Sequence, residues 1–207
     1  MKTPVDHLTR RGGPTRSGGD IEAVQAQFER NAIWNRMVTA GDRLPDMPLT
    51  EADLGLIHLH RLRHTGPVVL MFFAYVGSVR CEAALRRYRD RLEPDLVGLN
   101  AHLVAVSPQV PERLRELKRR LDLGFLVASD PRHALIDRLN IGFEVPGADT
   151  VLGAGRAVLP FATVVVADRA GFVRHVDVRG DWASPTDPQE IIRVVEAIES
   201  RRRPDFG

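Results

Sequence analysis

Hydrophobic and polar positions change their period several times between residues 56 and 201, and each change marks a new structural element. Short apolar runs bounded by turn residues predict buried strands, whereas apolar positions three and four residues apart predict helices. The predicted strands cover residues 56–62, 67–73, 102–107, 124–129, 162–168 and 172–178. The predicted helices cover residues 79–92, 110–121, 133–139 and 188–201. Residues 143–159 follow neither period and are predicted to be irregular.

The last part of this pattern has the clearest local signals. A turn at residues 169–171 separates the final two apolar runs, which predicts an antiparallel hairpin. Asp187 is the expected N-cap of the last helix, and Pro188 follows at its first position. Glu190 would then complete a capping box with Asp187.

The order of these elements predicts the fold class. Strands and helices alternate, and a hairpin and a closing helix follow, which is typical of a three-layer α/β sandwich with a mixed sheet. We expect this domain to span residues 41–201, after an N-terminal amphipathic helix at residues 21–40. Residues 1–20 are rich in Gly, Thr, Arg and Pro and predict a disordered arm, and residues 202–207 form a tail.

Composition limits the cellular environments in which we expect this domain to work. Apolar residues make up 43% and charged residues 27% of the 207 positions, as in ordinary globular domains. A single cysteine excludes an intrachain disulfide framework. The first twenty residues lack the apolar core of a signal peptide, and no apolar run reaches transmembrane length. These features favour a cytoplasmic, reducing environment without a membrane partner.

The basic residues do not indicate a nucleic-acid partner. The pI is near 9.1, yet the formal net charge is only +2, and the basic clusters alternate with acidic residues. One such cluster, at residues 118–120, is interpreted as part of a solvated helix face. Aromatic residues make up 6% of the chain, so stacking platforms for bases are not expected.

Cys81, the single cysteine, lies where the apolar run 67–73 gives way to the helical pattern 79–92. A thiolate, unlike a thiol, is a strong nucleophile, and the first turn of a helix favours an anion. Ser78 precedes Cys81 by three residues and can cap the same helix. The competing interpretation is a packed, inert thiol, because free cysteine is among the most buried residue types.

Several stretches together resemble one known family. They are GDRLPDMPL (41–49), TGPVVLMFF (65–73), LVAVSPQVPE (103–112), VASDP (127–131) and VVVADRAGFVRHVDV (164–178). In this order and spacing they resemble the peroxiredoxin-like proteins of the alkyl hydroperoxide reductase/thiol-specific antioxidant (AhpC/TSA) group, between Gly41 and Ile198. The resemblance implies a thioredoxin-like three-layer sandwich and a thiol-dependent peroxidase.

The resemblance also implies roles for individual residues. The family's active-site loop reads Pro-x-x-x-Thr/Ser-x-x-Cys, which places Cys81 at the peroxide-reducing cysteine and Ser78 at the hydroxyl position. A one-cysteine enzyme of this kind would reduce hydrogen peroxide or organic hydroperoxides. It would then be recycled by a low-molecular-weight thiol or a thioredoxin-like protein, without a bound cofactor. Arg80 and Arg156 are the candidates to support the thiolate, and homodimerisation is expected from the fold family.

Three departures from the family pattern support an alternative. Ala74 replaces the loop proline, and the position of the family's activating arginine falls near Ala162. Glu82 follows the cysteine, and a carboxylate there raises the pKa of the thiol. The alternative is therefore a catalytically degenerate redoxin-fold protein that serves as a binding or assembly module. A third possibility keeps Cys81 reactive for monothiol transfer or a specialised biosynthetic step.

Two groups of residues that include histidine are candidate metal ligands. His58 and His60 would point to the same side of a strand, with His64 as a third ligand. No carboxylate or cysteine cluster accompanies them, so surface histidines of an edge strand are favoured and no metal is expected. His175 and Asp177 form a similar pair, and the interpretation is the same.

Overall fold

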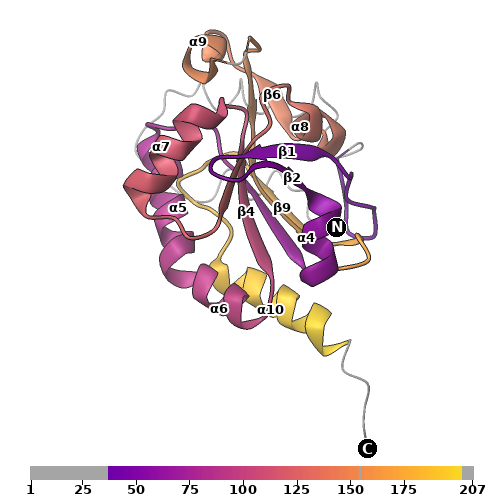
Figure 1. Cartoon of the computed structure of the whole chain (residues 1–207). Coiled ribbons are helices and arrows are strands. Elements are labelled where there is room, and N and C mark those ends of the chain that lie inside the picture. The colour runs from indigo at the N-terminus through magenta and orange to yellow at the C-terminus, as the bar shows by residue number, and fades with distance from the viewer. Residues whose placement is uncertain (1–36, 154, 202–207) are drawn as a thin grey trace, which may run out of the picture.

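The computed structural model describes residues 37–153 and 155–201 (Figure 1). Within them, seven strands form one sheet in the order β2-β1-β5-β4-β3-β8-β9, and β6 and β7 form a separate pair. The strands are β1 (Pro48–Glu51), β2 (Gly55–His58), β3 (Val68–Phe72), β4 (His102–Ser107), β5 (Leu126–Ser129), β6 (Gly142–Glu144), β7 (Val158–Pro160), β8 (Ala162–Ala167) and β9 (Val173–Arg179). The helices are α4 (Leu59–Thr65), α5 (Val79–Arg91), α6 (Glu93–Gly98), α7 (Pro111–Leu121), α8 (Ala134–Leu139), α9 (Ala148–Leu152) and α10 (Pro188–Ser200).

The large sheet is mixed, as predicted. Strands β3, β4 and β5 run parallel, whereas β8 is antiparallel to β3 and β9 is antiparallel to β8. At the other side of the sheet, β1 is antiparallel to both β5 and β2. The parallel strands require helical crossovers, which α5, α6 and α7 provide. Strand β3 therefore lies inside the sheet, between β4 and β8.

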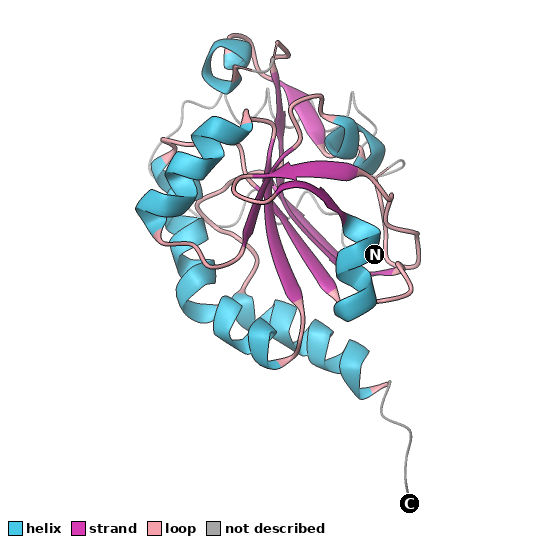
Figure 2. Ribbon diagram, in the orientation of Figure 1, coloured by secondary structure: helices cyan, strands magenta, loops and turns pink. Residues whose placement is uncertain are grey.

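Helices cover both faces of this sheet, and the sequence of β3 explains why (Figure 2). Alternate side chains of a strand point to opposite faces. Val69 and Met71 belong to a first core cluster with residues of α5, α6, α7 and α10. Val68 and Leu70 belong to a second core cluster with residues of α4 and α8. Because both faces are covered, the strand is apolar throughout, and the three-layer sandwich is confirmed.

The prediction of a strand at residues 56–62 was wrong in its second half. Strand β2 ends at His58, and α4 begins at Leu59. Leu59 is fully buried in the second core cluster, and Leu62 packs against the same cluster. The apolar residues here are three apart, which is a helical spacing, and burying them together overrides the rough alternation that precedes them.

Residues 143–159 were predicted to be irregular, but they contain most of β6 and β7 as well as α9. Phe143 and Leu159 are paired in the antiparallel register of β6 and β7, and both are buried. The Phe143 ring stacks on Phe161 with the ring centroids 4.4 Å apart. Elements of three to five residues are too short to display a period, so long-range packing determines them.

The hairpin of β8 and β9 and the final helix were correctly predicted, but the capping box was not. Helix α10 begins at Pro188, and Asp187 before it is extended without a side-chain capping bond. The Asp187 carboxylate instead accepts a hydrogen bond from Arg87 of α5 at 3.2 Å. The Glu190 carboxylate lies 3.7 Å from the ring of His175. Both acidic side chains are thus engaged by tertiary partners.

The predicted arm at residues 1–20 and the tail at 202–207 lie outside the described residues. Of the predicted helix 21–40, only residues 37–40 are described, and they form bends and a turn rather than helix. The following Gly41 donates a backbone hydrogen bond to the carbonyl of Val173, which places it against β9. Within residues 37–153 and 155–201, no helix has the length and apolar character needed to cross a membrane.

Candidate functional site

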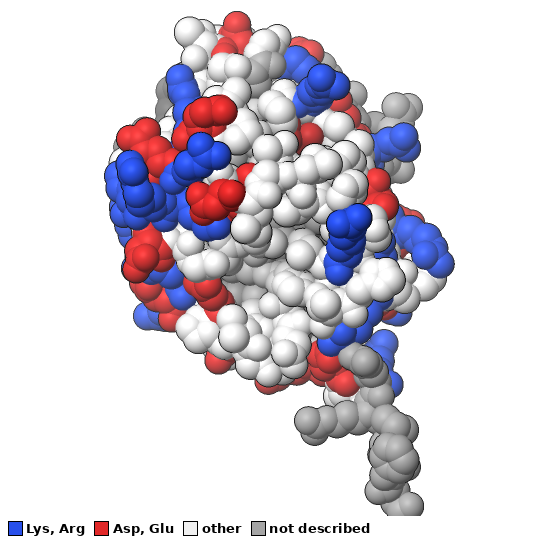
Figure 3. All heavy atoms as spheres, viewed as in Figure 1, with Lys and Arg blue, Asp and Glu red and all other residues white. Residues whose placement is uncertain are grey.

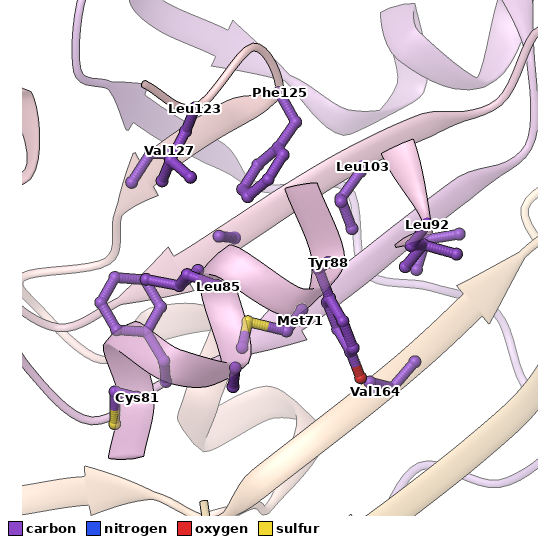
Figure 4. Close-up of a cluster of buried hydrophobic side chains, with 14 of the residues drawn as sticks. Met71, Cys81, Leu85, Tyr88, Leu92, Leu103, Leu123, Phe125, Val127 and Val164 are labelled. Carbon is purple, nitrogen blue, oxygen red and sulfur yellow. The ribbon is translucent and has the colours of Figure 1, made fainter. Parts of the chain in front are cut away.

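Cys81 lies in the first turn of α5, immediately beyond the carboxyl end of β3 (Figure 4). The connection, residues 74–78, is called the 74–78 loop below. Ser78 precedes the helix with an extended backbone, and its hydroxyl oxygen accepts a hydrogen bond from the Cys81 amide at 3.4 Å. Ser78 is therefore the N-cap, as predicted. Its capping fixes the start of α5 and with it the position of the cysteine.

The side chain of Cys81 is fully buried. It shares the inward face of α5 with Leu85 and Tyr88, at the spacing i, i+4 and i+7, and all three belong to the first core cluster (Figure 4). The helix pattern alone places these residues on one apolar face. The thiol is thus packed in the core beneath the 74–78 loop.

Burial raises the pKa of the Cys81 thiol, and its surroundings only partly oppose that effect. Hydrogen bonds from the Ser78 hydroxyl and from the backbone of Ala74 and Tyr75 lower the pKa. The carboxylate of Glu82 raises it again. The net result is a pKa of Cys81 above its ordinary value, so Cys81 is a thiol rather than a thiolate at neutral pH in this structure.

Glu82 itself is a buried carboxylate with several partners. Its two oxygens accept hydrogen bonds from Arg120 of α7 at 2.6 and 2.8 Å, and the Arg86 guanidinium is 3.5 Å away. One of the same oxygens also accepts the Gly77 amide at 3.0 Å. The Arg120 hydrogen bonds lower the pKa of Glu82, and although burial raises it, the net pKa is below the usual value. Glu82 is therefore ionised at neutral pH.

A second buried side chain, Gln109, holds the other half of the 74–78 loop. Its side-chain oxygen accepts the Val76 amide at 2.6 Å, and its side-chain nitrogen donates to the carbonyl of Val151 at 3.1 Å. The hydroxyl of Ser107 donates to the carbonyl of Ala74 at 3.2 Å. Ser107 ends β4 and Gln109 follows it, so the edge of the sheet supports the loop from within.

The two arginines considered as support for the thiolate are engaged elsewhere. Arg80 donates to Asp181 at 3.1 Å. Arg156 pairs with Asp137 at 2.7 Å and also donates to the carbonyl of Arg132. Consecutive residues of a helix project about 100° apart, so Arg80 cannot share the inward direction of Cys81. The structure therefore gives the sulfur a hydroxyl and amide environment without guanidinium support from either residue.

The position near Ala162, where the resemblance puts an arginine, is the first residue of β8. Ala162 is buried and lies opposite Arg179 of β9 in the antiparallel register. The guanidinium of Arg179 donates to Asp177 at 2.6 Å, and the hydroxyl of Thr186 donates to the same carboxylate at 2.8 Å. Asp177 is thus part of an ion-paired network with Arg179 rather than a partner of His175.

The histidines considered as a metal site do not share a strand. His58 ends β2, whereas His60 and His64 lie in α4. The rings follow one another at centroid distances of 5.4 and 6.3 Å, and His60 lies 2.9 Å from the carboxylate of Asp46. Within the described residues, no group of three or more His, Cys, Asp or Glu side chains is arranged to hold a metal ion.

Sequence reasoning missed three side chains that organise this region: Glu82 as a structural partner, Gln109, and Arg120. The cluster at residues 118–120 was interpreted as a solvated face, which was wrong for Lys118. Lys118 is largely buried and pairs with the buried Glu51 at 2.7 Å, whereas Arg120 is exposed and still pairs with the buried Glu82 at 2.6 Å. A signal was present for Lys118, because it lies one residue from Leu117 and three from Leu121 on the buried stripe of α7.

The comparison with protein-family models identifies one family. Residues 40–176 match the model of the AhpC/TSA family. A search of curated proteins finds no match.

Solved structures show the same fold at low sequence identity. Peroxidoxin BcpB from Mycobacterium tuberculosis is 18% identical, with 78% of this chain and 98% of that chain covered and a TM-score of 0.67. A yeast mitochondrial 1-Cys peroxiredoxin is 16% identical, with 83% of each chain covered and a TM-score of 0.63. A peroxiredoxin-like protein from Aquifex aeolicus is 16% identical, with 78% and 88% covered and a TM-score of 0.64.

Proposed function

The chain belongs to the AhpC/TSA family, and on that premise we propose that it is a one-cysteine peroxiredoxin-like thiol peroxidase acting through Cys81. The observation that carries the proposal is the placement of Cys81 in the first turn of α5. There the Ser78 hydroxyl caps the amide of Cys81, and the Ser78 side chain and the backbone of Ala74 and Tyr75 lower the pKa of the thiol. Such donors stabilise a thiolate and can orient an oxygen bound beside it.

The proposed chemistry uses hydrogen peroxide or an organic hydroperoxide as oxidant. The Cys81 thiolate attacks the terminal peroxide oxygen, a sulfur–oxygen bond forms, and the oxygen–oxygen bond breaks. The leaving alkoxide or hydroxide takes a proton and departs as alcohol or water. The cysteine has then lost two electrons, and the peroxide has gained them. Ser78 positions the thiolate but does not change its own protonation state in this sequence.

Return to the thiol requires an external reductant, because the chain has no second cysteine. A first external thiol attacks the sulfenic acid, which releases water and leaves a mixed disulfide. A second thiol attacks that disulfide and restores Cys81. The similar yeast mitochondrial 1-Cys peroxiredoxin has a thiol resolving mechanism via glutathione/thioredoxin systems, which supports a low-molecular-weight thiol or a thioredoxin-like protein here. We place this cycle in a reducing compartment such as the cytoplasm.

Sulfenic acid trapping tests the peroxidase directly. The folded protein is treated with hydrogen peroxide in the presence of a dimedone-type probe, and the adduct is located by mass spectrometry. We expect an adduct at Cys81 that is absent from Cys81→Ser and reduced in Ser78→Ala. Ser78 also caps α5, so the assay is run where both variants retain their circular dichroism. No adduct at Cys81, even when the pH is raised to the most alkaline value at which the protein stays folded, would refute the proposal.

The complete burial of Cys81 favours one competing function, a catalytically degenerate redoxin-fold module for binding or assembly. A thiol pKa above about 8.5 is expected of an inert cysteine, and the raised pKa of Cys81 agrees with that. The two functions differ in the oxidation assay: the module keeps an unmodified thiol after exposure to peroxide, whereas the peroxidase forms sulfenic acid.

We also propose that the chain forms a homodimer, which is motivated by the fold family. Sedimentation velocity at several protein concentrations tests this, and a concentration-independent monomer would contradict it.

A further inference from the structure

We propose that Glu82 and Arg120 form a latch that holds the 74–78 loop closed over Cys81 and so controls how often small molecules reach the thiol. The latch is a property of the fold, but its biological purpose rests on the proposed thiol chemistry. In this view Glu82 and Arg120 are positioning residues. They are placed to contact neither the substrate nor the reacting sulfur of Cys81, and they act through the 74–78 loop.

The geometry of Glu82 carries this inference. Its carboxylate joins three parts of the chain: it belongs to α5, it binds Arg120 of α7 through both oxygens, and it accepts the amide of Gly77 in the loop. Two parallel hydrogen bonds between a guanidinium and a carboxylate are strong and specific in direction. Figure 3 shows acidic and basic side chains gathered on this side of the molecule, over α5 and α7.

The latch is built so that it can open while the core stays packed. The side chain of Arg120 is 45% exposed, so water can replace its bonds to Glu82. Gly77 in the loop is exposed, and Val79, the first residue of α5, is exposed to 81%. Gln109, which holds Val76, is fully buried. The inner half of the loop is therefore fixed by Gln109, and Ser78 is held by its capping bond to α5, whereas Gly77 between them is held by Glu82.

The two halves of the latch have opposite effects on the charge beside the thiol. Glu82 raises the pKa of Cys81, and Arg120 neutralises Glu82. The other charged groups near this point are Arg80 and Arg86 on α5 and Asp181 in the segment before α10, where Arg80 pairs with Asp181. Removing Glu82 therefore lowers the titration midpoint of Cys81, whereas removing Arg120 leaves the Glu82 carboxylate with only Arg86 as a cationic partner and raises the midpoint.

The experiment measures disulfide exchange of Cys81 with 4,4′-dithiodipyridine in the full chain. This probe is neutral at the pH used and needs no peroxide. Glu82→Gln and Arg120→Gln are compared with the matched controls Glu112→Gln and Arg119→Gln, which are exposed residues of α7. We expect the two latch variants to react at least tenfold faster at the alkaline plateau. We expect the midpoint to fall in Glu82→Gln and to rise in Arg120→Gln, and the controls to stay within twofold of wild type.

Urea unfolding of each variant separates local opening from global loss of stability. An acceleration no greater than the increase in the globally unfolded fraction would overturn the latch, as would unchanged rates or equal midpoint shifts in both variants. If a variant does not fold, salt provides the test in the wild type: 1 M NaCl screens the pair from the exposed side of Arg120 and should accelerate exchange. No acceleration by salt would also overturn it. Absence of sulfenic acid together with faster exchange would refute the peroxidase but keep the latch.

Discussion

The hydroxyl of Tyr88 offers a clean test of how α5 is anchored. It donates a hydrogen bond to the carbonyl of Thr186 at 2.9 Å, and both residues are fully buried. Burial raises the pKa of Tyr88, so the phenol is protonated at neutral pH and can donate this hydrogen bond. Tyr88→Phe removes the single oxygen while the ring remains in the first core cluster.

The expected cost follows from this geometry. Removing the donor leaves the Thr186 carbonyl buried without its partner, which costs about 1–3 kcal/mol in mutational series. We therefore expect a loss of about 1.5 kcal/mol in the free energy of unfolding. For a chain of this size, 1 kcal/mol corresponds to roughly 2–4 °C in Tm, so the melting temperature should fall by about 3–6 °C.

The chain contains a matched control in its second tyrosine, Tyr75. Tyr75 is partly buried, and its hydroxyl has no hydrogen-bond partner among the described residues. Tyr75→Phe should therefore change the free energy of unfolding by less than about 0.5 kcal/mol. Urea denaturation followed by tryptophan fluorescence and circular dichroism measures both variants. Equal losses in the two variants would refute the reasoning. Removal of a hydroxyl that makes no hydrogen bond would then cost as much as removal of the Tyr88 hydroxyl, which donates to Thr186.

Two further predictions concern ion pairs. Burial alone would raise the pKa of Glu51, but hydrogen bonds from Lys118 and from nearby amides outweigh it and hold the pKa below its usual value. Lys118→Met should therefore cost about 3 kcal/mol at neutral pH. The difference from wild type in urea titrations should shrink as the pH falls through the lowered pKa of Glu51 and the carboxylate becomes protonated. A pH-independent difference would contradict this. Arg156→Gln breaks a half-exposed pair with Asp137 and should change stability by less than about 0.5 kcal/mol. It should leave the yield of sulfenic acid at Cys81 unchanged. A large loss of the dimedone adduct would instead indicate that Arg156 supports the thiolate.

The central strands could be predicted from the sequence because burial on both faces leaves a visible mark. The apolar runs that form β3, β4 and β8 are continuous and end at turn residues. In contrast, β6, α9 and β7 are three to five residues long, and their pairing depends on contacts such as that between Phe143 and Phe161. Such contacts join residues through the fold and leave no local period.

The candidate site shows the same division. The location of Cys81 and the capping role of Ser78 follow from a strand-to-helix turn, which is local information. The complete burial of Cys81 depends on how the loop closes, and that closure depends on the pairing of Glu82 with Arg120, 38 positions along the chain. Runs of charged residues are usually solvated. The sequence around Arg120 therefore does not distinguish an arginine that pairs with a buried carboxylate from one that faces only solvent.

The packing of the cysteine sulfur inside the first core cluster links its oxidation to folding. Each oxygen added to Cys81 occupies volume that leucine and tyrosine side chains already fill, and interiors accept extra heavy atoms only by displacing neighbours, typically at about 1–3 kcal/mol. A sulfinate would in addition bring a permanent charge into an apolar surrounding. Over-oxidation of Cys81 would therefore lower the stability of the fold. The oxidised chain would unfold more often and be more accessible to proteases.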